Sequence, residues 1–315
     1  MTRPPSVTIG LMAAWLAGCA PSAGPALPGS PAASGARASH PPSSRDLLYI
    51  SDIGKNSVFV FSYPNGKLVQ TLQGFSSPVR ICSDSSGNVF VTNTDARDVL
   101  KYAHGGKTPV ATYRDPNYLP TDCAVDAGTG TLAVTNYGPS GSNTGSVAVF
   151  PNGKGPAKIL QAPMVQAYLF CAYDGSGNLF VDALDYSYDF LLIELPKGAT
   201  KFKRIALDQA FLGWGGVQWD GKDLAIGDGI SIVYDFAIKG SKGTRVRTVR
   251  LRKAINVVQF ALDAGMLIGP DGPNGAAHDV GLWNYPQGGV PAQTIGDGTL
   301  ENPSGAAISL ATSPR

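Results

Sequence analysis

The sequence predicts an all-β fold, a six-bladed β-propeller of four-stranded antiparallel blades, on three observations. Six similar segments fill the chain from residue 46 onward, and their second strands recur after 41, 43, 47, 45 and 42 residues, a period typical of propeller blades. The 39 Gly and 24 Pro residues favour turn-rich strands over helices. Gly and Asn clusters separate the apolar runs. The apolar residues that mark the period are Leu48, Val89, Leu132, Leu179, Leu224 and Met266.

Each segment contains four expected strands joined by tight turns. Asp-rich turns such as residues 84–88 follow the first strands, and their Gly and Asn residues tolerate the positive φ of short hairpins. Pro-containing turns such as residues 63–66 follow the third strands. First strands are expected at 79–84, 122–126, 169–174, 216–220, 257–263 and 305–311, and second strands at 47–52, 89–93, 132–136, 179–183, 224–228 and 266–270.

The two ends of the chain predict how the ring closes. The first segment begins at Asp46 with a second strand, and an unpaired first strand at 305–311 finishes the sequence. We therefore expect the N-terminal and C-terminal strands to share one blade. Such closure removes the exposed edges that an open sheet leaves available for aggregation.

The residues before the repeats are expected to be a leader and a tether. Arg3 precedes an apolar stretch at 7–16, too short to span a bilayer, which predicts a signal peptide over residues 1–18. The sequence Leu16-Ala17-Gly18-Cys19 resembles a bacterial lipobox, which implies that Cys19 carries a lipid anchor; the alternative is an ordinary cleavable signal. Residues 19–45 are rich in Pro, Ala and Ser and predict a flexible tether. Residues 46–315 then form a single propeller domain.

These features predict a location and a class of partner. A lipid anchor attaches the protein to a membrane of the bacterial cell envelope, and Ala20 resembles the residue after the lipidated cysteine in outer-membrane lipoproteins. We therefore expect the outer membrane or cell surface. The net charge of +2 provides no general attraction to nucleic acid. The expected ligand is a protein, peptide or saccharide.

Three cysteines remain in the expected propeller domain. Cys82, Cys123 and Cys171 all fall in first strands, and an odd number cannot pair fully within one chain. Cys82 lies two residues before the aspartate of its strand, whereas Cys123 and Cys171 each lie three residues before theirs. Because side chains alternate between the two faces of a strand, Cys82 is expected to point to the face opposite to that of the other two. We interpret all three as small buried apolar residues rather than as a disulfide, a nucleophile or a metal site.

The repeats resemble those of a known group. The segments Ser77-Pro78-Val79, Gly87-Asn88-Val89-Phe90-Val91 and Asn302-Pro303-Ser304-Gly305 are similar to the NHL and YVTN-type repeats of bacterial extracytoplasmic six-bladed propellers. The resemblance extends over nearly all of residues 46–311 and implies the fold. It does not imply one activity, because such propellers include binding scaffolds, lactonases, lyases and dehydrogenases.

Candidate ligand-binding residues gather on one face of the predicted propeller. The loops between second and third strands and between successive blades share a face, and in this chain they are the long loops. Their aromatic residues predict a platform for sugars, peptides or partner loops; the alternative is that these residues pack beneath their own loops. Polar residues that begin the first strands should approach the axis. The candidates are Arg80, Asp122, Tyr137, Tyr186, Trp214 and Asn256, with Tyr118, Tyr168, Tyr188 and Phe211 as further loop aromatics.

An enzymatic alternative depends on a divalent cation. Asp and Asn residues end the second strands, as at Asp52 and Asp182, and could coordinate a hard cation; they could equally cap turns. Resemblance to gluconolactonase-like propellers would imply a metal-dependent hydrolase whose ligands include a glutamate. Only Glu301 is loosely similar in placement, and His278 is the one histidine in a long loop. A binding scaffold without catalytic residues is therefore the preferred interpretation.

One cluster of positive charge follows the outer strand of the fifth expected blade. Basic residues on an exposed rim block edge-to-edge pairing of sheets, and they could also contact anionic polymers of the envelope. The sequence leaves both interpretations open. The cluster comprises Arg245, Arg247, Arg250, Arg252 and Lys253.

Overall fold

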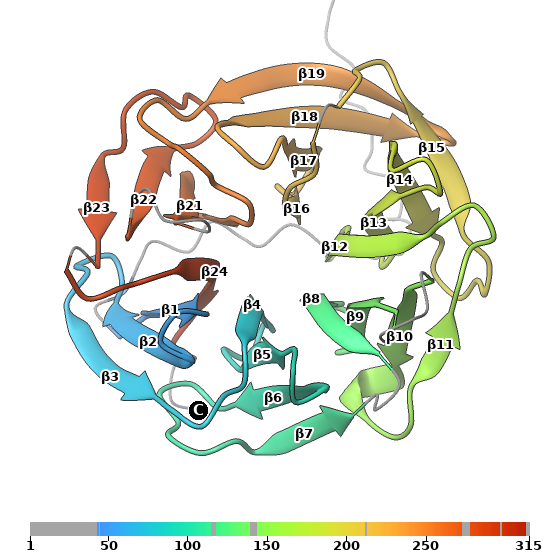
Figure 1. Ribbon diagram of the computed structural model, residues 1–315. Helices are drawn as coiled ribbons and strands as arrows, with labels where there is room; N and C mark the ends of the chain where they lie inside the picture. Colours follow the sequence, from blue (N-terminus) through green and yellow to red (C-terminus); the bar gives the residue numbers. More distant parts are fainter. Residues whose placement is uncertain are drawn as a thin grey trace, which may run out of the picture. The chain divides into compact units, whose positions relative to one another are not determined.

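In the computed structural model of the protein, the described residues form five β-sheets around a common axis (Figure 1). Four sheets have four strands and one has eight. The predicted signal peptide, Cys19 and nearly all of the tether lie outside the described residues, as do parts of the predicted long loops. The residues described are 43, 45–114, 118–138, 144–211, 213–272, 278–296 and 298–312.

Strands follow one another from the axis to the rim. The strands at the axis are β4 (Pro78–Ser83), β8 (Leu119–Val125), β12 (Ala167–Tyr173), β16 (Val217–Trp219), β20 (Ala261–Asp263) and β24 (Pro303–Ser309). The next are β1 (Leu47–Asp52), β5 (Val89–Asn93), β9 (Leu132–Tyr137), β13 (Leu179–Leu184), β17 (Leu224–Gly227) and β21 (Met266–Asp271). The third are β2 (Ser57–Ser62), β6 (Asp98–Tyr102), β10 (Ser146–Phe150), β14 (Phe190–Leu195), β18 (Ile232–Lys239) and β22 (Asp279–Asn284). The outer strands are β3 (Leu68–Leu72), β7 (Ala111–Arg114), β11 (Lys158–Leu160), β15 (Lys203–Leu207), β19 (Lys242–Arg250) and β23 (Gln293–Ile295).

The predicted hairpin turns form because aspartate side chains bond their backbone. Asp84 Oδ1 accepts the N–H groups of Ser86 and Asn88, each at 2.9 Å, and Asp174 repeats this arrangement after β12. Gly87 has φ +78°, a conformation that favours glycine. Consequently the strands on either side of these turns lie within one or two residues of their predicted positions.

The last strand of the chain pairs with the first. β1 and β24 are antiparallel, with Leu48 opposite Ile308 and Ile50 opposite Ala306. All residues of β24 are buried. This pairing agrees with the predicted sharing of one blade by the two ends of the chain.

The eight-stranded sheet departs from the sequence prediction. It arises because outer strands β15 and β19 pair in parallel, with Ala206 opposite Lys242 and Leu207 opposite Gly243. Gly243 permits this approach, since a Cβ there would lie 2.5 Å from Cδ2 of Leu207. A second departure is β20, which is shorter than predicted because the residues before it bond to loops, including Val257 N–H to the carbonyl of Ile230 at 2.9 Å.

The hydrophobic core consists of clusters between neighbouring sheets. Large aromatic residues such as Trp283, Tyr49 and Tyr168 are fully buried there. Because each sheet buries both faces against its neighbours, its strands are apolar on both sides. No helix formed by the described residues is long and apolar enough to cross a membrane.

Candidate functional site

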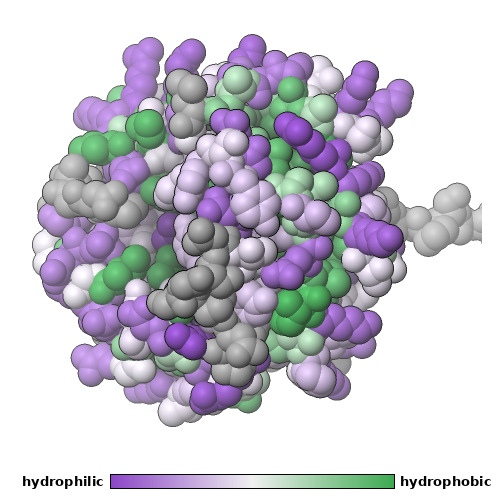
Figure 2. All heavy atoms as spheres, turned by 45° about the vertical axis from the view of Figure 1, so that its right-hand side comes forward, coloured by the Kyte–Doolittle hydropathy of each residue, from purple (hydrophilic) through white to green (hydrophobic). Residues whose placement is uncertain are grey.

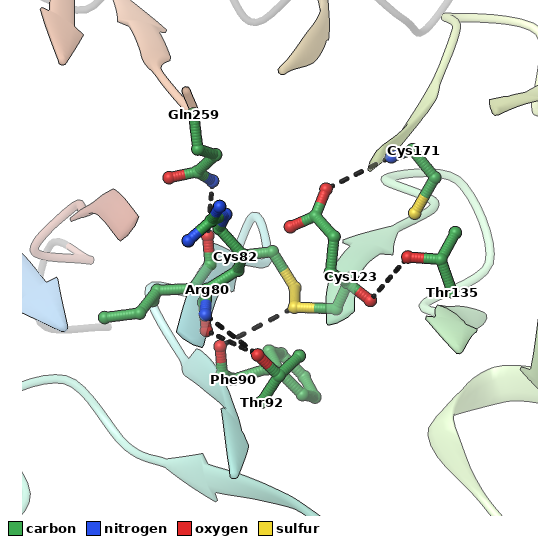
Figure 3. Close-up of a disulfide and its surroundings, with 10 residues drawn as sticks. Arg80, Cys82, Phe90, Thr92, Cys123, Thr135, Cys171 and Gln259 are labelled. Carbon is green, nitrogen blue, oxygen red and sulfur yellow. Dashed lines mark hydrogen bonds between the residues drawn. A yellow bond between two sulfur atoms is a disulfide. The ribbon is translucent and has the colours of Figure 1, made fainter. Parts of the chain in front are cut away.

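Two of the predicted ligand-binding residues, Arg80 and Asp122, lie on the adjacent axial strands β4 and β8; Figure 3 shows Arg80. Both are buried. Arg80 donates from Nη1 to the carbonyl of Val79 at 3.0 Å, whereas its Nε finds no hydrogen-bond partner among the described residues. Burial lowers the pKa of Arg80 to about 10, although Asp122 and Tyr137 oppose the shift. The axis therefore holds a desolvated cation with unused hydrogen-bonding capacity.

Trp214 joins this group through an aromatic stack. The guanidinium carbon of Arg80 lies 5.3 Å from the ring centre of Phe170, close enough for a cation–π interaction. The ring of Phe170 is in turn stacked with Trp214, with centres 6.4 Å apart and planes 28° from parallel. Trp214 is 40% exposed, so the stack connects the buried cation to the surface of the long-loop face.

Asp122 is a buried carboxyl group that is only partly satisfied. Its Oδ2 accepts the backbone N–H of Cys171 at 3.1 Å, while Oδ1 has no partner among the described residues. Burial raises the pKa of Asp122 to about 7, against the opposing effects of two backbone N–H groups and of Arg80. Near neutral pH this residue can therefore exist in either protonation state.

The stability of the protein should depend on the ionisation of Asp122. A folded-state pKa above the unfolded value of about 3.9 means that ionisation opposes folding: the cost is absent below pH 4 and complete above about pH 7. We expect Asp122→Asn to stabilise the protein by about 2 kcal/mol more at pH 8 than at pH 5. Urea unfolding at both pH values measures this difference, with the exposed Asp95→Asn as the control. Equal effects at the two pH values would contradict a raised pKa.

The structure brings some of the six candidates together and leaves others apart. Tyr137 lies near Arg80 and Asp182, since burial and the charge of Asp182 raise its pKa and Arg80 lowers it. Tyr186 is 58% exposed on the loop after β13. Asn256 lies before β20, where its backbone N–H donates to Asp271 Oδ1 at 2.7 Å. The axial group is thus Arg80, Asp122, Tyr137 and Trp214.

The loop aromatics divide between the two predicted roles. Tyr168 is fully buried, and its hydroxyl accepts the N–H of Ala162 at 2.5 Å. Phe211 stacks on Phe190, with ring centres 4.4 Å apart. These two pack beneath loops, and Tyr118 is half-buried. By contrast, Tyr137, Tyr186, Tyr188 and Trp214 remain exposed.

Sequence reasoning missed three further exposed side chains on the same face. They lie in loops of the same two kinds as the aromatics, and being aliphatic or thioether residues they carried no aromatic signal. One of them follows the aspartate at the end of a second strand, and two precede the inner strands β12 and β20; these positions could have identified them. They are Met164, Ile230 and Ile255.

Two acidic residues of the second strands accept backbone N–H groups. Asp52 accepts backbone N–H groups of Lys55, Glu301 and Asn302, and Asp182 accepts those of Phe170 and Gly215. Among the described residues, no three His, Cys, Asp or Glu side chains lie close enough to share a metal ion. His278 contacts the backbone carbonyl of Glu301. Asp52 therefore caps the turn after β1, whereas Asp182, inside β13, bonds the neighbouring strand β12 and the loop before β16.

A cavity of about 280 Å³ lies at the axis, on the side away from the long loops. The wall of the cavity begins one residue after Arg80 in β4 and one residue after Asp122 in β8. From there it extends to the turns that follow the first strands. The size of the cavity is near the lower limit for small-molecule sites. Sequence reasoning missed it, because side-chain packing and not strand order decides where the axis stays open. Lining residues include Cys82, Cys123, Cys171, Trp219, Asp220 and Tyr285.

The interpretation of all three cysteines as unpaired is wrong. Cys82 and Cys123 form a disulfide between β4 and β8, with Cα atoms 5.6 Å apart, whereas Cys171 is free and buried (Figure 3). The sequence assigns the first two to opposite strand faces. Neighbouring sheets in a ring, however, present opposite faces to one another, so such side chains converge. The disulfide therefore staples two adjacent sheets at the axis.

Comparison with known proteins identifies the fold. A chain in the crystal structure of a nidogen/laminin complex is 13% identical with TM-score 0.69, and the alignment covers 85% of this protein and all of that chain. The fold is a β-propeller. Two proteins of unknown function are also similar. One from Bacteroides caccae is 12% identical with TM-score 0.62, and the alignment covers 84% of this protein and 98% of that chain. One from Desulfotomaculum acetoxidans is 11% identical with TM-score 0.56, and the alignment covers 84% of this protein and 99% of that chain. No protein-family model and no curated protein matches the chain.

Proposed function

We propose that this propeller is a binding scaffold of the bacterial cell envelope that contacts its ligand through the long-loop face. The proposal includes six blades, with the eight-stranded sheet counted as two blades joined at their rims. Its four-strand halves, β12–β15 and β16–β19, and the four separate sheets support that count. The propeller neighbours support a scaffold for interactions, since one of them comes from a nidogen/laminin complex.

The main support is the exposure of large apolar side chains on one face. Among the described residues, six of them occupy loops between second and third strands or between successive units, a seventh is at the end of β9, and the other six are on or beside outer strands. A concentration of aromatic and apolar side chains on loops is typical of interaction surfaces. The seven are Tyr137, Met164, Tyr186, Tyr188, Trp214, Ile230 and Ile255.

The loop that carries Tyr186 and Tyr188 is held in a defined conformation, which favours binding over random exposure. Asp185 Oδ1 accepts the N–H groups of Ser187 and Asp189 at 2.8 and 3.0 Å and so shapes the loop. Within it, Tyr188 is 69% exposed and has φ +66°, an unfavourable conformation for a bulky residue. Preorganised aromatic rings lose little entropy when a ligand binds. The loop thus stores strain in order to present an aromatic side chain.

Ligand arrays test the proposed face. We expect full-length protein with Cys19→Ser, which lacks the lipid, to bind members of a peptide array or a glycan array. The variant Tyr186→Ser/Tyr188→Ser/Trp214→Ala should lose at least about tenfold in affinity for them, because such anchors carry most of the binding energy. Val69→Ser/Val110→Ser/Val246→Ser changes three equally exposed positions near the outer strands as a control. The proposal would be contradicted if the first variant kept its affinity, if the control variant lost as much affinity, or if the unmodified protein bound no member of either array.

The proposed lipid anchor has a separate test. Three acyl chains on Cys19 would bury many CH₂ groups at about 0.8 kcal/mol each, so attachment should be permanent. We expect Cys19→Ser to move the protein from the membrane fraction to the soluble fraction of fractionated cells. The matched control is Cys171→Ser, which changes a buried cysteine of the propeller. Retention of the Cys19→Ser protein in membranes after a high-salt wash would contradict the anchor.

A further inference from the structure

The parallel pairing of β15 and β19 joins two strongly basic outer strands into one surface. β15 contributes Lys203 and Arg204, β19 contributes Lys242, Arg245, Arg247 and Arg250, and neither strand contains an acidic residue. The two strands meet side by side at the rim (Figure 1). In the sequence these basic residues are up to 47 positions apart, from Lys203 to Arg250, and the fold brings them together.

Charge is segregated onto this side of the molecule. Residues 197–253 contain twelve Lys and Arg residues against five Asp residues, an excess of seven positive charges. The whole chain has a net charge of only +2, so the remaining residues carry a net charge of −5. Such a separation orients a protein toward an anionic surface even when its net charge is small.

Six cations on or beside the strands of this surface are free to meet an external anion. Lys203 is paired with Glu194 at 3.1 Å, Arg247 with Asp235 at 2.7 Å, and Arg245 bonds Gln209. Lys222 lies 3.8 Å from Asp223, and the exposed Lys197 and Lys201 precede β15. The six remaining cations are on or beside β15, β18 and β19; they are exposed, and in the described part of the chain they have no carboxylate partner. We call them the basic rim: Arg204, Lys239, Lys242, Arg250, Arg252 and Lys253.

Edge protection accounts for at most two residues of the basic rim, Arg204 and Arg250. A charge that blocks strand pairing must sit on an unpaired edge, yet β19 begins with residues already paired to β15. Lys239 is at the end of β18, and Arg252 and Lys253 lie beyond β19. At about 3.3 Å per residue, the nine residues of β19 extend the rim over roughly 30 Å. In Figure 2, hydrophilic side chains project along the upper edge, where β19 lies in Figure 1.

We propose that the basic rim is a docking surface for anionic phospholipid headgroups. The choice of a membrane over a soluble polyanion depends on the proposed anchor at Cys19. A tether of some 25 residues has a mean reach of about 25–30 Å, which keeps the rim close to the bilayer. Each basic residue near an anionic surface strengthens binding about fivefold. Docking by the rim holds the propeller edge-on and leaves the long-loop face open to its ligand.

Vesicle flotation of full-length protein with Cys19→Ser tests the rim without the lipid. We expect binding to vesicles of phosphatidylglycerol and phosphatidylcholine, little binding to phosphatidylcholine alone, and weakening as salt rises. Reversal of four rim charges (Arg204→Glu, Lys242→Glu, Arg250→Glu and Arg252→Glu) should lower the affinity several hundredfold. The control reverses four exposed lysines outside the region with the same change in net charge (Lys67→Glu, Lys107→Glu, Lys154→Glu and Lys158→Glu).

The outcomes separate the rim from the anchor. Three results would overturn docking on a membrane. The first is an equal loss of vesicle affinity in the two fourfold variants, and the second is equal binding to both vesicle types. The third is binding to soluble polyphosphate with none to vesicles. Melting temperatures of both variants show whether they are folded, and single reversals of Arg250 and Arg252 replace the fourfold variant if it is not. Because the lipid is absent, failure of the anchor appears only in the cell-fractionation test, whereas failure of the rim appears only with vesicles.

Discussion

A protein that ends at Asn302 is expected to lose its cooperative unfolding transition. The deletion removes β24, which supplies the antiparallel partner of β1 and whose residues are all buried. It also removes contacts across the axis: Ser304 Oγ donates to the carbonyl of Val79 at 2.7 Å, and the Ala306 N–H donates to Gln259 Oε1 at 2.7 Å. The ring would therefore be opened at the pairing of β1 with β24, which is its seam, and it would also lose contacts at the axis.

The size of this effect is comparable to the stability of a typical domain. Pairing of β24 contributes several backbone hydrogen bonds at about 1 kcal/mol each and the burial of Ile308 at about 2 kcal/mol, on the order of 5–10 kcal/mol in total. Natural domains are stable by only about 5–15 kcal/mol. Exposure of the β1 edge should also promote aggregation.

Calorimetry and circular dichroism measure this loss. Deletion of residues 312–315 is the control, because it keeps β24 and the bond from Ala311 N–H to Asp46 Oδ1 at 2.8 Å. A point variant tests the same seam: a Cβ at Gly305 would lie 2.8 Å from the Cα of Arg80, so Gly305→Val should lower the melting temperature strongly. A native-like transition in the protein ending at Asn302 would show that the seam does not hold the ring.

Sequence predicted the strands well because local chemistry decides where they start and stop. Asp84 bonds its own turn, so the turn after β4 is encoded within five residues. The same holds after β12, where Asp174 accepts the backbone N–H groups of its own turn. Most predicted strands therefore differ from the observed ones by one or two residues. The C-terminal strand was predicted for a different reason, as the one strand missing from the first repeat.

Features that depend on two sheets could not be predicted in the same way. The disulfide requires that Cys82 and Cys123 face each other across neighbouring sheets, and the parallel pairing requires a glycine at 243 opposite Leu207. Neither leaves a periodic signal. At the candidate site, the starts of the inner strands correctly placed Arg80 and Asp122 near the axis. Their unsatisfied atoms and the stack through Phe170 appeared only with the packing.

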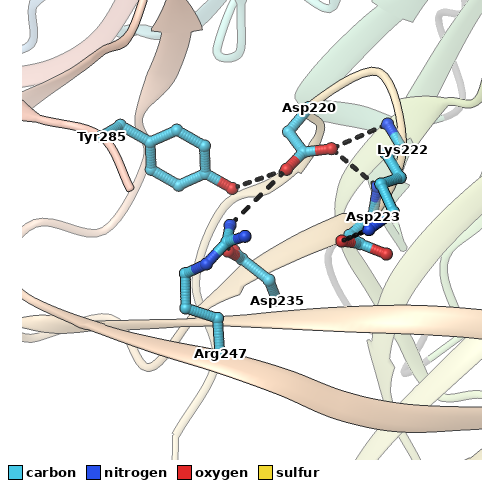
Figure 4. A network of polar contacts seen from close by, with 6 residues as sticks. All are labelled: Asp220, Lys222, Asp223, Asp235, Arg247 and Tyr285. Atoms are coloured by element: carbon cyan, nitrogen blue, oxygen red, sulfur yellow. Dashed lines mark hydrogen bonds and ion pairs between the residues drawn. The ribbon is translucent and has the colours of Figure 1, made fainter. Parts of the chain in front are cut away.

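Arg247 shows how the fold can change the role of a residue in a charged cluster. Sequence placed it on an exposed rim, but its side chain turns inward to Asp235, with Nη1 2.7 Å from Oδ2 (Figure 4). Asp235 is fully buried, and its Oδ1 has no partner among the described residues. Asp220 lies 4.0 Å from the same Nη1 and accepts the hydroxyl of Tyr285 at 3.1 Å. The arginine thus compensates two carboxylates in one network.

Replacement of Arg247 by Met is expected to cost about 2–3 kcal/mol of stability. Removing one partner of a fully buried ion pair costs about 3–5 kcal/mol, and water reaching the partly exposed position of Arg247 should reduce this. Burial already raises the pKa of Asp235, while Tyr285 and Arg247 oppose the shift. Without Arg247 the carboxyl should ionise less readily, so the loss of stability should be smaller at pH 5 than at pH 8.

Urea unfolding of a double-mutant cycle measures this coupling. The second change, Asp235→Asn, removes the charge that Arg247 compensates, so Arg247→Met should cost at least about 1 kcal/mol less in the Asp235→Asn variant than in the native protein. Arg250→Met, three residues further along β19 and exposed, should change stability by less than about 0.5 kcal/mol. Additive effects of the two substitutions would mean that the ion pair is not coupled. In that case the network would hold Asp235 through Tyr285 and backbone packing, and Arg247 would belong functionally with the basic rim.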